Sequence, residues 1–346
     1  MSRAPTGARF AVPPWGREPI DGPAVRTLVR QAALADGAEA LSGHVLQALD
    51  VAGAGDGVGG LLVRAGDLDP AVTDPDDPAG VVVARGVDPA EVVVGPAYRR
   101  RGIGTALVRA VLDRQGSVWA YGNLPEAAAL ARQLGLARTR TLLQLRRVDS
   151  PTAAAPSASA FVGSGASMRR PAAGEAVLPD GVRIRTFHPG QDDEAFLAVN
   201  ARAFAWHPEQ GRLDLAGFRA ETTQDWFDPA GFFLAVTGEP GAERVLGFHW
   251  TKVHPADPTP GSGPAGPVGE VYVLGVDPLS PIRGLGAPLT GAGLRYLAGR
   301  GLATVMLYVE AGNARAVNLY RRFGFSTYLS NVVYARPVES GETASG

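Results

Sequence analysis

The 346-residue chain contains no cysteine and only one lysine. The absence of cysteine excludes disulfides, thiolate metal sites and a cysteine nucleophile. The other 32 of its 33 lysine and arginine residues are arginines, so arginine stands in for lysine almost everywhere. We therefore expect Lys252 to lie where a compact ammonium is needed and a planar guanidinium does not fit.

The chain also lacks long apolar runs and any large excess of charge. No run approaches the roughly 18–20 apolar residues that cross a bilayer, and residues 1–20 contain no apolar segment typical of a secretory signal. A net charge of −1 supplies no basic field for nucleic acid. We therefore expect a cytoplasmic monomer that binds neither membranes nor nucleic acids.

The length and the distribution of small residues predict two domains. A chain of 346 residues is long enough for two hydrophobic cores of ordinary size. Between 149 and 180 the sequence is rich in Ala, Ser, Pro and Gly and has almost no periodic apolar residues, as flexible linkers do. The predicted divisions are a loose tail (1–20), a first domain (21–148), the linker (149–180), a second domain (181–338) and a C-terminal tail (339–346).

The two halves repeat the same series of elements. In each, a β-branched run leads to a proline, Pro96 or Pro278, and the first glycine of a loop follows six residues later. A helical pattern, a short strand, an asparagine (Asn123 or Asn313) and a second helix come next. Strands precede the loop and alternate with helices after it, which predicts an α/β fold of two tandem domains, each a mixed, mostly antiparallel sheet flanked by helices. A repeat of this length indicates duplicated domains rather than a solenoid.

The second half allows an element-by-element prediction. We expect strands at 182–186, 232–237, 245–253, 270–276, 304–309 and 327–336, and helices at 192–203, 215–222 and 289–297.

The glycine loops between a strand and a helix suit a phosphate-bearing ligand. Their glycines let backbone N–H groups turn toward an anion, and the following helix adds unpaired N–H groups and a partial positive charge. The loops lack the third glycine and downstream acidic residue of a dinucleotide fingerprint, and also the Gly-Lys-Ser/Thr of nucleotide loops. Two copies in register therefore predict a pyrophosphate site of another kind.

This constellation resembles the GNAT acyltransferase superfamily, in which a splayed strand end binds the pantetheine and the glycine loop binds the pyrophosphate of acetyl-CoA. The resemblance implies acetyl-CoA as co-substrate. The residues that it assigns to acetyl-CoA are Val92, Val93, Val94, Arg99, Arg100, Arg101, Gly102, Ile103 and Gly104 in the first half, and Leu274, Gly275, Val276, Pro281, Ile282, Arg283, Gly284, Leu285, Gly286, Ala287, Asn313, Ala316 and Asn318 in the second.

Four segments of the second half carry a closer resemblance. They begin at His207, His249, Gly269 and Leu307, and read HPEQG, HWTKVHP, GEVYVLGVDP and LYVE. Together they resemble the mycothiol synthase family of tandem GNAT proteins, over about residues 30–338. The resemblance implies acetylation of the cysteinyl amine of cysteinyl-glucosamine-inositol. It assigns this acceptor to Glu209, Lys252, Glu270 and Tyr308.

Acetyl transfer from a thioester to an amine requires a neutral amine, a donor to the thioester oxygen and a proton for the leaving thiolate. An α-amine has a pKa of roughly 7.7–8, so a carboxylate is a sufficient base, and Glu270 is the candidate. Tyr320, seven residues after Asn313, is the candidate acid. The resemblance gives the same two roles and assigns the amide N–H of Leu274 to the thioester oxygen.

Aligning the two halves suggests that only the second one reacts. Alignment on the shared proline places Asp88 opposite Glu270, and alignment on the asparagine places Leu130 opposite Tyr320. Leucine cannot donate a proton. The second loop, however, has Pro281 at a position where an N–H would help to bind phosphate, which predicts weaker binding of acetyl-CoA by the second half.

Two other functions fit the same residues. The fold is compatible with another acceptor, such as an aminoglycoside, a polyamine or a protein N-terminus, and also with an acetyl-CoA-binding module that has no turnover. The presence of both Glu270 and Tyr320 favours an enzyme. His207, His249 and His254 have no matching acidic cluster, so we expect no metal.

Overall fold

The computed structural model describes residues 15, 20–43, 45–46, 49, 58–69, 71–86, 88–148, 177–206, 210–256 and 266–337. The predicted C-terminal tail, most of the predicted N-terminal tail and linker, and Glu209 lie outside these residues. None of the described helices is both long and apolar enough to cross a membrane.

The chain forms two compact units. The described residues up to Leu143 and from Leu329 onward make the first unit, and those from Gln144 to Tyr328 make the second. Two strands therefore run from one unit into the other. This division differs at those strands from the boundaries at 148 and 181 that the sequence suggested.

The first unit is a sheet covered by helices on both faces. Its elements are α1 (Gly22–Asp36), β1 (Val58–Arg64), α3 (Ala65–Leu68), β2 (Pro78–Arg85), β3 (Ala90–Val94), α4 (Ile103–Gln115), β4 (Ser117–Ala120), α5 (Pro125–Gln133) and the start of β5 (Ala137–Val148). The strands β1, β2 and β3 are antiparallel, β3 and β4 are parallel, and the end of β11 (Ser326–Ala335) pairs with β4.

Alternating side chains of β2 divide the first unit's core between these two faces. Val81 and Val83 pack with Val25 and Leu28 of α1, whereas Val82 packs with α4. Such alternation is the period of a β-strand buried on both faces. Helix α1 itself begins after Asp21, whose carboxylate accepts the N–H of Ala24, and ends at Gly37 with a φ of 64°.

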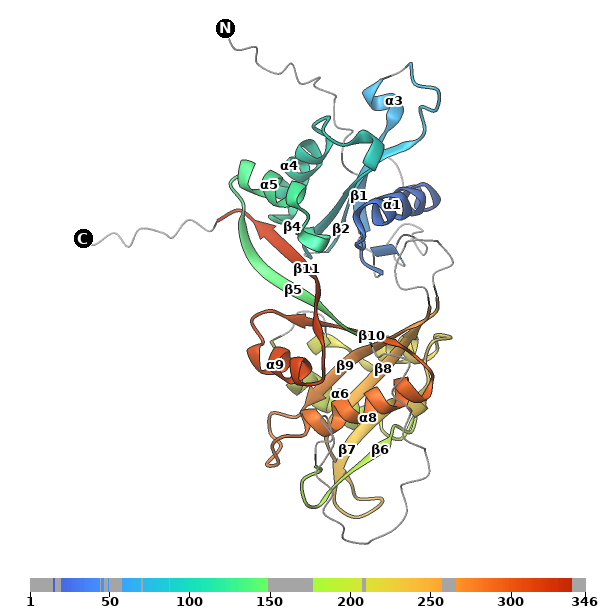
Figure 1. The fold of residues 1–346 in the computed structure, drawn as a ribbon, viewed down its shortest axis with the longest axis vertical. Coiled ribbons are helices and arrows are strands. Elements are labelled where there is room, and N and C mark those ends of the chain that lie inside the picture. The colour runs from blue at the N-terminus through green and yellow to red at the C-terminus, as the bar shows by residue number, and fades with distance from the viewer. Residues whose placement is uncertain are drawn as a thin grey trace, which may run out of the picture. The chain divides into compact units, whose positions relative to one another are not determined.

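The second unit has the same architecture. Its elements are the end of β5, β6 (Val182–Thr186), α6 (Asp193–Ala203), α7 (Leu215–Thr222), β7 (Phe232–Thr237), β8 (Arg244–His254), β9 (Val268–Val276), α8 (Gly286–Gly299), β10 (Thr304–Glu310), α9 (Ala314–Arg322) and the start of β11. The strands lie in the order β6-β7-β8-β9-β10-β5, and β9 and β10 are parallel whereas β6 to β9 are antiparallel (Figure 1). The predicted fold class and the predicted strands and helices of this half are confirmed, with ends that shift by a few residues.

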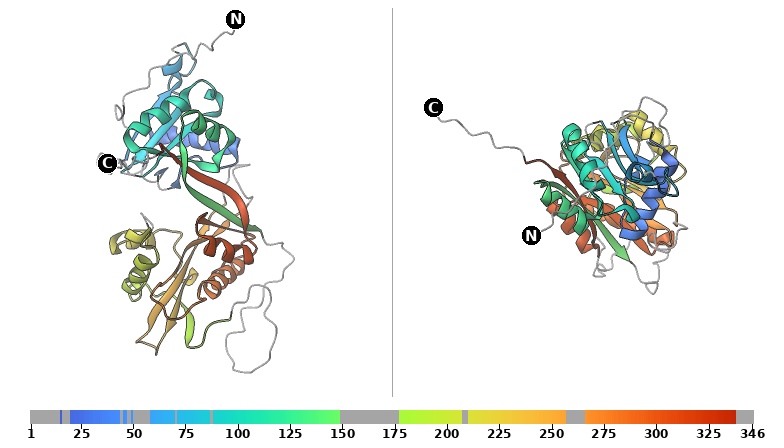
Figure 2. Two further views of the ribbon diagram at one scale, coloured as in Figure 1. Left: turned by 90° about the vertical axis from the view of Figure 1, so that its left-hand side faces the viewer. Right: turned by 90° about the horizontal axis from the view of Figure 1, so that it is seen from above.

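Helices cover both faces of the second sheet. Figure 2 shows α6 and α7 (yellow-green) on one side of the strands and α8 and α9 (orange to red) on the other. The α6 side is an aromatic cluster in which the rings of Phe232 and Trp250 stack with centroids 5.0 Å apart. The other face is aliphatic, and Leu285 and Leu289 of the α8 region pack on Ala235 and Leu246. The rigid aromatic face fixes β8 and β9, which carry the candidate site.

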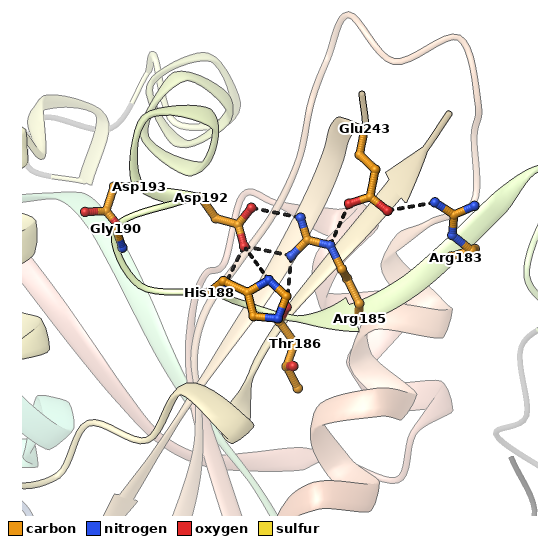
Figure 3. Close-up of polar contacts among 8 residues, drawn as sticks. All are labelled: Arg183, Arg185, Thr186, His188, Gly190, Asp192, Asp193 and Glu243. Atoms are coloured by element: carbon orange, nitrogen blue, oxygen red, sulfur yellow. Dashed lines mark hydrogen bonds and ion pairs between the residues drawn. The ribbon is translucent and has the colours of Figure 1, made fainter. Parts of the chain in front are cut away.

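An ion-pair network stabilises the edge of the second unit (Figure 3). Arg185 of β6 binds both oxygens of Asp192, at 2.7 and 2.8 Å, and also Glu243 at 2.7 Å. Glu243 accepts a second bond from Arg183, and Asp192 accepts the backbone N–H of His188. The bidentate geometry closes the turn between β6 and α6 against the loop that precedes β8.

Candidate active site

Strands β9 and β10 pair over only part of their lengths. Their parallel register runs from Val268 opposite Thr304 to Val271 opposite Leu307. Both strands continue beyond that point, to Val276 and to Glu310. This part of β9 therefore has no paired residue of β10 within the described chain, and its backbone N–H and C=O groups can bind an extended ligand. The splayed strand expected from the sequence is present here.

A β-bulge in β9 lies beside this opening. Trp250 of β8 is opposite Val273 and Thr251 is opposite Val271, so Tyr272 is an extra residue. A bulge increases the local twist and redirects a side chain. Here the ring of Tyr272 meets Trp250 edge to face, with centroids 5.3 Å apart, and Leu274, the predicted oxyanion donor, follows two residues later.

The loop from β9 to α8 is held by buried polar contacts. Asp277 is fully buried and binds Arg202 at 2.8 and 3.1 Å, and the bonds from that guanidinium hold the pKa of Asp277 below its usual range. The hydroxyl of Ser280 accepts the N–H of Ile282 at 3.1 Å. Because Pro281 has no N–H and that of Ile282 is already bonded, two donor positions at the start of the predicted phosphate loop are lost.

The remainder of this loop keeps the features of an anion-binding turn. Gly284 has a φ of 85°, a conformation that favours glycine. Leu285 is buried against Leu289, which anchors the start of α8. Gly286 and Ala287, the first residues of α8, belong to the turn of a helix whose N–H groups lack intrahelical partners. The loop is therefore rigid at its base, and the exposed Arg283 supplies a positive charge.

The corresponding loop of the first unit has a similar turn, but one of its arginines is already bound to a carboxylate within the protein. Gly102 has a φ of 87° and precedes α4, and Arg100 also has a positive φ. Arg99 binds both carboxylate oxygens of Asp36 at 2.7 Å, so it is an anchor between the loop and α1. Arg101 is exposed and lies over the ring of Tyr98. Arg100 and Arg101 are thus better placed than Arg99 to meet a phosphate.

Glu270 lies on β9 directly opposite Lys252 of β8. Its side chain is buried, and its Oε2 lies 2.6 Å from Nε2 of His254. A buried carboxylate must be hydrogen-bonded to remain stable. The site therefore contains a carboxylate in a fixed orientation next to the open strand edge, as a base for an incoming amine requires.

Lys252 is bounded by aromatic rings. Its Nζ lies 4.2 Å from the ring centroid of Trp226 and 5.0 Å from that of Tyr272. The hydroxyl of Tyr272 donates to Glu221 at 2.9 Å, and burial, with Glu221, raises the pKa of Tyr272 well above its usual value. The ammonium thus lies against two rings, and the expectation that a guanidinium does not fit there stays a prediction.

Tyr308, on β10 one residue beyond the last paired position, lies next to the opening. Its hydroxyl accepts a hydrogen bond of 2.6 Å from Nε2 of Gln144, a buried residue of β5. Gln144 also contacts the sulfur of Met306 at 3.7 Å. The hydrogen bond from Gln144 of β5 thus fixes the position of the phenol hydroxyl.

Tyr320 is buried on α9, with its ring edge-on to Phe325. Within the described residues its hydroxyl makes no hydrogen bond, and burial raises its pKa, so the phenol keeps its proton at neutral pH. The helix is capped by Asn313, whose Oδ1 accepts the N–H of Ala316 at 3.1 Å. Asn318 is exposed on the same helix. Two of the predicted acetyl-CoA ligands, Asn313 and Ala316, therefore bind each other.

The structure places the residues that the alignment of the two halves compares. Glu270 lies within β9 and pairs with Met306 of β10. Asp88, which alignment on the proline puts opposite it, precedes β3 and does not lie within that strand. The ends of α5 and α9 place Ala131, not Leu130, opposite Tyr320.

The first unit has a buried carboxylate of its own, Glu91 on β3. Glu91 accepts the N–H of Ser42 at 2.6 Å and the hydroxyl of Tyr121 at 3.0 Å, and burial raises the pKa of Tyr121 further than this carboxylate does. Val83 of β2 is opposite Glu91, whereas Lys252 of β8 is opposite Glu270. Neither valine nor Ala131 can supply a charge or a proton.

Three residues of the site were missed from the sequence. Trp226 and Gln144 lie far from every motif, and only the fold brings them to Lys252 and Tyr308. His254 stands two residues after Lys252 on one face of a strand, and this spacing is the signal that could have placed it at the site. Among the residues that the structure describes, no three His, Asp or Glu side chains gather as a metal site.

Comparisons with known proteins agree with this geometry. The model of the acetyltransferase (GNAT) family matches residues 62–135 and 199–325. Mycothiol acetyltransferase of Parafrankia sp. is 47% identical over 91% of this chain and 94% of its own, and that of Acidothermus cellulolyticus is 44% identical over 98% and 97%.

Solved structures show the same fold at lower identity. A GCN5-related N-acetyltransferase from Sphaerobacter thermophilus has a TM-score of 0.60 at 24% identity, over 94% of this chain and 96% of its own. A tandem GNAT protein from the clavulanic acid biosynthesis pathway has a TM-score of 0.57 at 17% identity, over 91% and 94%. The chain belongs to the GNAT acetyltransferase family and, within it, to the mycothiol acetyltransferases.

Proposed function

We propose that this chain transfers the acetyl group of acetyl-CoA to the cysteinyl amine of cysteinyl-glucosamine-inositol, and that its second unit performs the reaction. The observation that carries the proposal is the position of Glu270, a buried carboxylate opposite Lys252 and two residues before the open part of β9. The identity of 47% with a mycothiol acetyltransferase over nearly the whole chain supports the choice of acceptor.

The open edge of β9 is where the pantetheine arm of acetyl-CoA would pair. The N–H of Leu274 would donate to the thioester oxygen, and the N–H groups around Gly284 and Gly286 would bind the pyrophosphate. The exposed Asn318 on α9, and in the first unit the segment Val92 to Gly104, are further candidates for contact with acetyl-CoA.

Glu270 would take the proton of the cysteinyl amine as its nitrogen forms a bond with the thioester carbon. The bond from that carbon to sulfur breaks, and Tyr320 would donate its proton to the thiolate. Burial favours the neutral phenol in the resting enzyme, so its proton is available to be donated. The same low-polarity surroundings make a bare thiolate costly, which favours its protonation. Glu270 then holds one proton more and Tyr320 one fewer, and exchange of one proton with solvent at each residue restores the resting enzyme.

Lys252, Tyr308 and Glu209 would bind the acceptor. The ammonium and the phenol suit the hydroxyl groups of a sugar or inositol, and Glu209 suits an ammonium. A polyamine is the less favoured acceptor, because Lys252 next to Glu270 would repel its second cation.

An acetyl-transfer assay with a panel of amines, read by product mass, tests the proposal. We expect the cysteinyl pseudodisaccharide to give one acetylated product and to exceed aminoglycosides and polyamines in kcat/KM. Turnover of another amine without acetylation of the pseudodisaccharide would contradict the proposed choice of acceptor. Binding of acetyl-CoA with no turnover of any amine would instead indicate a binding module.

A further inference from the structure

His254 and Glu270 form a pair in which one partner reaches solvent. The side chain of Glu270 is 9% exposed and that of His254 is 34% exposed, and Nε2 and Oε2 lie 2.6 Å apart. The two residues lie on the neighbouring antiparallel strands β8 and β9 of the second unit, in which Lys252 also pairs with Glu270. The pair therefore joins the buried carboxylate to a partly exposed ring.

This contact is the only hydrogen bond of the Glu270 carboxylate within the described residues. Lys252, although directly opposite, makes no ion pair with Glu270 there, and its ammonium lies against the rings of Trp226 and Tyr272. A short bond to a charged acceptor is among the stronger hydrogen bonds in proteins. The orientation of the carboxylate thus depends on His254.

We infer that His254 is a positioning residue for Glu270: an Nε2–H of the ring occupies Oε2 and leaves Oε1 to take the proton of the acceptor amine. The inference rests on the proposed role of Glu270 as the base. A carboxylate without this bond would rotate about its last side-chain torsion and lose the alignment that proton transfer needs. The amine is then bound but seldom deprotonated.

Three substitutions separate this role from a merely structural one. His254→Gln places an amide N–H near the position of Nε2, whereas the shorter His254→Asn reaches only the position of Nδ1 and His254→Leu has no donor. We expect His254→Gln to keep kcat within about 5-fold of wild type, and Asn and Leu to lower it by about 10- to 100-fold, the size of a hydrogen bond to a charged group. The KM for acetyl-CoA should not change in any of them.

The experiment is steady-state kinetics of the full chain with the cysteinyl pseudodisaccharide, with melting temperatures as a check of folding. If the His254→Leu variant does not fold, the comparison of His254→Gln with His254→Asn still tests the inference, because both new side chains are polar and of similar size. Equal kcat values for Gln and Asn, or a Leu variant that keeps wild-type kcat, would overturn the inference.

Glu270→Gln, measured alone and together with His254→Leu, separates this inference from the proposed function. If the two residues act as one unit, the double variant should be no slower than Glu270→Gln alone. Wild-type turnover by Glu270→Gln would remove the proposed base itself. A loss in Glu270→Gln with none in His254→Leu would overturn only the role of His254, and multiplied losses in the double variant would do the same.

Discussion

The ammonium of Lys252 lies 4.2 Å from the ring centroid of Trp226, which makes the only lysine of the chain one half of a cation–π pair. The rings of Trp226 and Tyr272 define where the ammonium can point. A substitution of Trp226 should therefore act through Lys252 even where it does not touch the acceptor. Trp226→Leu should raise the KM for the acceptor by about 3- to 30-fold, in proportion to the loss of the cation–π contact.

Lys252→Arg provides a second test of the same pair. The guanidinium is planar and larger than the ammonium, so we expect a similar rise in the KM for the acceptor despite the unchanged charge. Initial-rate measurements with varied acceptor give both values. An Arg variant with wild-type kinetics would show that the position needs only a positive charge.

Removal of the Tyr320 hydroxyl should affect chemistry and leave the fold intact. Tyr320→Phe should lower kcat by about 10²- to 10⁴-fold, the usual contribution of a general acid. Because the hydroxyl makes no hydrogen bond within the described residues and the ring packs on Phe325, the free energy of unfolding should change by less than about 1 kcal/mol. Kinetics and denaturant unfolding of the same sample test both parts, and an unchanged kcat would exclude Tyr320 as the acid.

Gln144 should act on acceptor binding through Tyr308. Gln144→Leu removes the 2.6 Å hydrogen bond to the phenol, and we expect the KM for the acceptor to rise by about 3- to 10-fold, in line with the energy of one hydrogen bond. Thr139→Val is a matched control, because it removes a hydrogen bond from the same strand, to the carbonyl of Val333 in the first unit. A larger kinetic effect of the control than of Gln144→Leu would contradict the role of Gln144.

Stability at low pH should depend on Arg185. Burial would raise the pKa of Asp192, but the bonds from Arg185 and from the His188 N–H outweigh it and hold this pKa below its usual value. Arg183 and Arg185 likewise lower the pKa of Glu243. A carboxyl with a lowered pKa stabilises the fold at pH values above its unfolded-state pKa, and this contribution is lost as pH falls through the folded-state value.

Arg185→Met should therefore lower the free energy of unfolding by about 2 kcal/mol at pH 7, between the values for exposed and buried ion pairs. The difference from wild type should shrink as pH falls below about 5, where the carboxyls of the unfolded chain begin to protonate. Urea unfolding between pH 3 and 7 provides the measurement. A difference in the free energy of unfolding that grows toward low pH would contradict this prediction.

The sequence was sufficient for the parts of the fold that depend on local patterns. The apolar run at 232–237 predicts β7 with its observed bounds, and the glycine pattern places the turn at Gly284 with its positive φ. It was not sufficient for the β-bulge in β9, because the extra residue Tyr272 is visible only in the strand register.

Contacts between distant elements were also beyond the sequence. Trp226 reaches Lys252 only because the segment after α7 packs on the aromatic cluster around Trp250. The binding of Arg99 to Asp36 is similar, since the two residues are far apart in the chain and the resemblance assigned Arg99 to acetyl-CoA. Local sequence patterns predict the loop and its charged residues, whereas the packing of distant elements decides which of these residues is already paired within the protein.

Labelled acetyl transfer by matched variants of the two units tests the central claim most directly. With acetyl-CoA labelled in the acetyl group and the cysteinyl pseudodisaccharide as acceptor, mass spectrometry should detect one labelled acetyl on the cysteinyl nitrogen. We expect Glu270→Gln to lose about 100-fold or more of this activity, and Glu91→Gln, which changes the buried carboxylate of β3 in the first unit, to stay within a few-fold of wild type. Retained turnover in Glu270→Gln, or an equal loss in a folded Glu91→Gln, would contradict the assignment of the reaction to the second unit.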